Sequence, residues 1–231
     1  MNTERLTDKI KHMLAIAHDP SASESEREQA MNKAHSLMLK HGIEVAHEDH
    51  TSGGGGGGGY GHREMDLPGV YAETQAQMLY FIALSYKSFD MVLTKVPHSS
   101  SVRVTIAGPE AQLDDLYRMF ESILEQSTTE RKDWASKTLR GINRSVQKRH
   151  IKSFYLGYGS KVADRIEAIL EAEASQRDKQ ALVLVKDKAT NYLEGMHGKL
   201  ESKKRKQSVA SSAFVVGSLA GERAQLNNQL A

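Results

Sequence analysis

The N-terminal part of the chain places hydrophobic side chains three and four residues apart, which is the spacing of amphipathic helices. One predicted helix covers residues 4–17. A second follows Ser23 and Glu26, whose separation fits a capping box, and Gly42 fits the position that ends it. Because the connection is short, the two helices predict an αα-hairpin over residues 1–46.

A run of glycine from Gly53 to Gly59 interrupts this pattern. Glycine has no side chain to bury and loses the most backbone entropy when it is ordered. We therefore expect a Gly-rich flexible linker over residues 47–66 and a separate helix-rich domain over residues 67–231.

Within that domain the period of the pattern changes from helix to strand and back. It predicts a helix that ends near Tyr86, then two strands over residues 89–96 and 102–107 joined by a hairpin loop. Pro109 suits the first position of the next helix, whose apolar stripe reaches Leu124.

Longer helical patterns follow over residues 151–174 and 211–229. Between them the apolar run 181–185 predicts a third strand, and residues 189–200 predict a short helix. The expected fold class is α+β and predominantly helical. It combines an N-terminal αα-hairpin with a tethered, helix-rich domain around a small, about three-stranded sheet.

Two segments of the C-terminal half resemble each other. Phe154 and Gly157 have the same spacing as Phe214 and Gly217. Either this echo arises by chance, or both helices use glycine to approach a neighbour closely. The separation of Gly217 and Gly221 also favours close helix packing.

Composition narrows the class of protein. The chain has 39% hydrophobic and 26% charged residues, which is typical of a folded globular protein. It has no cysteine, which excludes a disulfide scaffold, a thiol nucleophile and Cys-based zinc sites. We find neither a signal peptide nor an apolar run of the roughly 20 residues that span a bilayer, and we expect a cytoplasmic protein without a membrane partner.

The net charge of +2 is unevenly distributed along the chain. Residues 131–152 hold many cations against a single acid, Asp133, and this stretch is called the basic segment below. Within it Arg140, Arg144 and Lys148 recur every four residues, which would align them on one face of a helix. The candidate nucleic-acid-binding residues are Arg131, Lys132, Lys137, Arg140, Arg144, Lys148, Arg149, Lys152, Tyr155, Lys203, Lys204, Arg205 and Lys206.

Phosphate backbones are the commonest partners of such cations, and Tyr155, Tyr158 or Trp134 could stack on bases. Two other interpretations stay open. Acidic helices elsewhere, for example over residues 110–125, could balance the cations and leave an ordinary solvated surface. Alternatively, an acidic protein could be the partner.

His47, Glu48, Asp49 and His50 are potential metal ligands, but they adjoin the glycine run and lack the defined fold that structural zinc requires. The glycine run itself lacks the Lys-Ser or Lys-Thr of a P-loop. We therefore expect no metal site and no cofactor, and the sequence nominates no catalytic residue.

The first 43 residues resemble an uncharacterised family of phages and bacteria known as domain of unknown function 2786. The features that carry this resemblance are Lys9-Ile10, Leu14-Ala15, Asp19-Pro20, Glu26, Ala30, Ala34, Leu37-Met38 and His41-Gly42-Ile43. The C-terminal region also looks similar to that of such proteins, at Trp134, Ser153-Phe154, Gly157, Ala181-Leu182-Val183, Gly217 and Gly221. The resemblance implies a phage or prophage origin, and hence the host cytoplasm, but no activity.

Three functions follow from these observations. The first is a non-enzymatic protein that binds DNA or RNA through the basic segment. The second is an interaction factor that binds a host protein through the N-terminal hairpin. The third is an enzyme whose site is assembled from scattered residues.

Overall fold

The computed structural model describes residues 59–173, 176–200 and 208–224, together with single positions between residues 9 and 37. The elements are β1 (Tyr60–Leu67), α3 (Ala72–Ser85), β2 (Asp90–Lys95), β3 (Val102–Pro109), α4 (Glu110–Thr138), α5 (Arg144–Glu173), α6 (Gln176–His197) and α7 (Ser211–Glu222). This order confirms a predominantly helical α+β fold with a small sheet.

The sheet has three strands in the order β1-β3-β2, and both outer strands pair antiparallel to β3. The outer strands therefore run parallel to each other, and α3 crosses from one edge of the sheet to the other. The predicted hairpin between β2 and β3 is confirmed. Its loop is closed by the N–H of Val96, which donates to the carbonyl oxygen of Ser101 at 3.2 Å.

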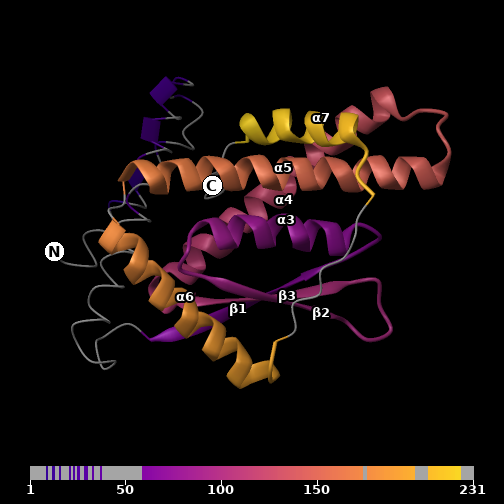
Figure 1. The fold of residues 1–231 in the computed structure, drawn as a ribbon. Coiled ribbons are helices and arrows are strands. Elements are labelled where there is room, and N and C mark those ends of the chain that lie inside the picture. Colours follow the sequence, from indigo (N-terminus) through magenta and orange to yellow (C-terminus); the bar gives the residue numbers. More distant parts are fainter. Residues whose placement is uncertain are drawn as a thin grey trace.

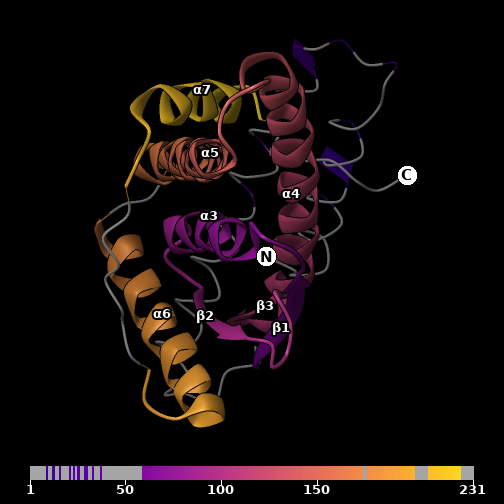
Figure 2. The same cartoon turned by 90° about the vertical axis from the view of Figure 1, so that its right-hand side faces the viewer.

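The elements form layers, with α7 on α5, α5 on α3 and α3 on the sheet, while α4 runs alongside the stack (Figures 1 and 2). Successive side chains of a strand point to opposite faces. Val104 and Ile106 are accordingly buried in the main core. Ala107 faces the other way and packs with Ala189 and Leu193 of α6.

The third strand is not the one that the sequence predicts. Residues 181–185 lie inside α6, where Leu182 and Val185 are 1% exposed but Leu184 is 46% exposed. Alternation in a strand would bury Leu182 and Leu184 together, whereas a helix buries positions three and four apart. The apolar run thus belongs to an amphipathic helix.

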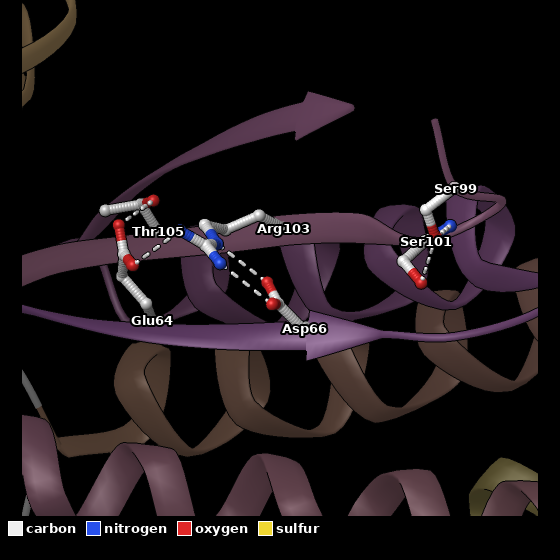
Figure 3. Close-up of polar contacts among 6 residues, drawn as sticks. All are labelled: Glu64, Asp66, Ser99, Ser101, Arg103 and Thr105. Atoms are coloured by element: carbon white, nitrogen blue, oxygen red, sulfur yellow. Dashed lines mark hydrogen bonds and ion pairs between the residues drawn. The ribbon is translucent and has the colours of Figure 1, made fainter. Parts of the chain in front are cut away.

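The actual third strand is β1, which overlaps the end of the predicted linker 47–66. Arg103 of β3 binds Asp66 of β1 through two hydrogen bonds of 2.7 and 2.9 Å, and Glu64 at 3.3 Å (Figure 3). The guanidinium lowers the pKa of the Asp66 carboxyl. On the opposite face of β1, Met65 and Leu67 enter the core.

α5 and α7 pack closely because each has a glycine that faces the backbone of the other helix. A Cβ atom on Gly157 would overlap the carbonyl oxygen of Phe214, and one on Gly217 would overlap that of Phe154. The interpretation that both helices use glycine for close approach is confirmed. Lys161 also pairs with Glu222 at 2.6 Å.

Near the N-terminus the predicted capping box is present. The Glu26 carboxylate accepts hydrogen bonds from the Ser23 N–H at 2.9 Å and from the Ser23 hydroxyl at 2.6 Å, which lowers its pKa. Ala30 is buried in the same hydrophobic cluster as residues of α3, α4 and α5, and Ile16 packs against that cluster. Apart from such single positions, the predicted hairpin lies outside the described residues.

Candidate functional site

The basic segment folds as two helices joined by a turn. α4 ends at Thr138, Gly141 has a φ of 77°, and α5 begins at Arg144. The predicted row of Arg140, Arg144 and Lys148 on one helix is therefore wrong, because Arg140 lies in the turn and a positive φ interrupts the helix.

Polar side chains close both helix ends at this turn. Oδ1 of Asn143 accepts a hydrogen bond from the N–H of Ser145 at 2.8 Å, which satisfies an amide at the start of α5. Nε2 of Gln147 donates to the carbonyl oxygens of Leu139 and Ile142 at 2.9 and 2.8 Å. These contacts fix how the two cationic stretches are arranged.

Aromatic packing holds the two stretches together. The Trp134 ring of α4 stacks on Phe154 of α5, with ring centroids 5.4 Å apart and planes 19° apart. The seven cations that stay exposed on this pair of helices and its turn form what we call the basic surface. They are Lys132, Lys137, Arg140, Arg144, Lys148, Arg149 and Lys152.

Most of these charges have no carboxylate partner. Lys137 pairs with Asp133 at 2.7 Å across one helical turn, and both side chains are at least 60% exposed. Within the described part of the chain, no other cation of the basic surface forms an ion pair. Two acids at the start of α4 do not neutralise the basic surface, because Glu110 and Asp114 both bind Arg63 of β1.

The position of the cations on α5 adds to the positive potential. The first turns of a helix carry a partial positive charge, which cations raise further. Arg144, Lys148 and Lys152 follow one another at four-residue spacing from the first residue of α5. Their mutual repulsion lowers stability, and an anion at this surface would relieve it.

Arg131 lies at the border of this surface and is partly buried. Its Nε donates to the hydroxyl of Tyr155 at 3.4 Å, and its Cζ lies 5.7 Å from the centroid of the Tyr71 ring. No carboxylate in the described ranges pairs with its guanidinium. Arg131 is therefore an oriented cation with unused donors.

Two aromatic predictions are wrong. Tyr155 and Tyr158 are each 0% exposed, so neither can stack on a base. The hydroxyl of Tyr155 lies 3.3 Å from that of Thr128 and accepts the hydrogen bond from Nε of Arg131. The hydroxyl of Tyr158 is buried and has no hydrogen-bond partner among the described residues, and burial raises its pKa.

Sequence reasoning missed Tyr71, which precedes α3 and is partly exposed beside Arg131. Burial raises the pKa of its hydroxyl, and the positive charges of Arg131 and Arg144 oppose that rise. The hydrophobic pattern that predicts the helix ending near Tyr86 includes Tyr71 among its apolar positions. Its place after Pro68-Gly69, at a helix start, was the signal that could have marked it as accessible.

The candidate nucleic-acid-binding residues Lys203 to Lys206 lie outside the described ranges. So do His47 to His50, where we expect no metal site. Among the described residues, no group of three or more His, Asp or Glu side chains could hold a metal ion. In the same part of the chain, no helix has the length and apolar character needed to cross a membrane.

Comparison with known proteins gives one match. Residues 5–45 fit the model of the family described as "Protein of unknown function (DUF2786)", which confirms the resemblance of the N-terminal part. The matched range ends before β1, so the resemblance of the C-terminal region and the phage origin stay predictions. Neither a curated protein nor a solved structure matches the chain.

Proposed function

We propose that the basic surface binds the phosphate backbone of DNA or RNA. One observation carries this proposal: seven exposed cations lie on one pair of helices and the turn between them, and of these seven only Lys137 has a carboxylate partner within the described residues. Lys and Arg that neutralise phosphates release condensed counterions, and this release supplies most of the affinity of non-specific binding.

The arrangement favours contacts to phosphates over contacts to base edges. The cations lie on two helices and a turn, and the two tyrosines expected to stack on bases are buried. Phosphate contacts position a protein on nucleic acid but carry no sequence information. We therefore expect binding with little sequence preference.

The proposal is tested with the double variant Arg144→Gln/Lys148→Gln. The matched control is Lys186→Gln/Lys199→Gln, which removes two cations from α6 and the residues after it, on the other side of the sheet (Figure 2). Electrophoretic mobility of labelled DNA and RNA is measured at about 50 mM salt with micromolar protein.

We expect the wild-type protein and the α6 control to retard both nucleic acids, and the Arg144/Lys148 variant to retard them less. Unchanged mobility with wild-type protein contradicts the proposal. Equal loss in both double variants would also contradict it, because net charge alone would then explain binding.

A further inference from the structure

We propose that Arg131 and Tyr71 together form a platform on which one unpaired base stacks, so that the basic surface prefers single-stranded nucleic acid to duplex. This inference rests on the proposed function, because it assigns a form of nucleic acid to the same surface. It adds an aromatic residue that the phosphate contacts alone do not require.

The geometry of the pair fits a stacked base. Cζ of Arg131 lies 5.7 Å from the centroid of the Tyr71 ring, which is within the range of a cation–π interaction. Within the described residues the guanidinium has no carboxylate partner. Bases in single strands stack on aromatic rings and on Arg guanidinium planes.

Hydrogen bonds within the protein orient the Arg131 side chain of the platform without a ligand. Nε of Arg131 donates to the hydroxyl of Tyr155 at 3.4 Å, and this hydroxyl also lies 3.3 Å from that of Thr128 and 3.4 Å from Nε2 of Gln75. Tyr155 is fully buried. A fixed arginine loses little side-chain entropy on binding, which favours affinity.

The turn before Tyr71 is exposed, from Pro68 to Val70. Gly69 in this turn has a φ of 90°, and no described atom lies within 4 Å of a Cβ atom built on it. Val70 is 63% exposed and adds an apolar surface beside Tyr71. The N-terminal end of α5 supplies Arg144 close by, whose charge acts on the Tyr71 hydroxyl. A base on the platform would therefore have a cation near its phosphate.

A duplex cannot use this platform. Its bases are already stacked and paired, so only its phosphates reach the cations, whereas a single strand presents the faces of its bases. Removing one aromatic stacking partner should weaken single-strand binding by roughly 5- to 100-fold. Duplex binding should not change.

The test compares Tyr71→Leu, which keeps apolar bulk without the aromatic face, with Tyr71→Phe, which keeps the ring. The probes are a fluorescein-labelled thymidine oligomer, a uridine oligomer and a DNA duplex of equal length, followed by fluorescence anisotropy at about 50 mM salt. Arg131→Lys is a further variant, because it keeps the charge but removes the planar guanidinium.

We expect Tyr71→Leu and Arg131→Lys to weaken binding of one or both single strands while duplex binding stays as in the wild type. Because Arg131→Lys also removes the Nε donor to Tyr155, its midpoint of thermal unfolding should fall, and binding is measured well below that temperature. Tyr71→Phe should bind like the wild type. Wild-type affinity of Tyr71→Leu for both oligomers would overturn the inference and leave the phosphate-binding function intact. Failure of the wild-type protein to bind any of the three probes would overturn both.

Discussion

At Gly157 and Gly217 the backbone of one helix fills the space where a side chain of the other would begin. Such a contact brings two helix axes close enough for backbone packing, and only glycine permits it. The spacing of these residues relative to Phe154 and Phe214 was visible in the sequence. The sequence did not show which helix each glycine would contact.

Gly157→Ala and Gly217→Ala should each destabilise the protein by about 1–3 kcal/mol, because the new methyl group must push the neighbouring backbone away. Gly195→Ala is the control, since Gly195 lies in the last turn of α6 and no described atom lies within 4 Å of a Cβ atom built there. It should stabilise by up to about 1 kcal/mol. Urea unfolding measures all three, and equal effects would contradict the packing.

Tyr155 and Tyr158 are both buried on α5 but differ in their hydroxyl partners. Tyr155→Phe removes the acceptor of Arg131 and should cost about 1 kcal/mol in the free energy of unfolding. Tyr158→Phe removes a hydroxyl that has no hydrogen-bond partner in the described part of the chain, and it should be neutral or stabilising. A larger loss for Tyr158→Phe than for Tyr155→Phe in thermal denaturation would refute this assignment.

At the scale of elements, segments with a clear hydrophobic period were predictable, and segments that lack such a period were not. The helix before β2, the hairpin of β2 and β3, and the apolar stripe at the start of α4 were visible as clear changes of period. β1 was missed because His62, Arg63, Glu64 and Asp66 give it a polar composition next to a glycine run. Its stability comes from pairing with β3, which is a long-range contact.

The short apolar run in α6 was predicted as a strand but is helical. Its Val and Leu residues favour strands locally, whereas the buried residues lie three and four positions apart, as in a helix. Gly141 and Asn143 were likewise visible signals of a helix end, although the regular spacing of the cations suggested one continuous helix.

Leu182→Ala and Leu184→Ala distinguish the helix from a strand with the same chemical change. In α6, Leu182 is 1% exposed and Leu184 is 46% exposed. We expect a loss of about 2–5 kcal/mol for Leu182→Ala and less than about 0.5 kcal/mol for Leu184→Ala. Chemical denaturation that gives similar losses would support the alternation of a strand instead.

At the scale of the whole molecule, α5 links the layers and the candidate site. It packs on α7 through Gly157, its Gly159 lies against Met78 of α3, and its first turns carry the cations. The composition of the basic segment was evident from the sequence. The contact between Tyr71 and Arg131 required the fold, because the two residues belong to different elements far apart in the chain.

The salt dependence of nucleic-acid binding tests the central claim most directly. Between about 50 and 200 mM salt, the logarithm of the association constant should fall against the logarithm of salt with a slope of about −3 or steeper, which corresponds to roughly four phosphate contacts. Arg144→Gln/Lys148→Gln should make the slope shallower by about 1.5. A slope near zero, or one that this variant leaves unchanged, would contradict the assignment of the basic surface to phosphate binding.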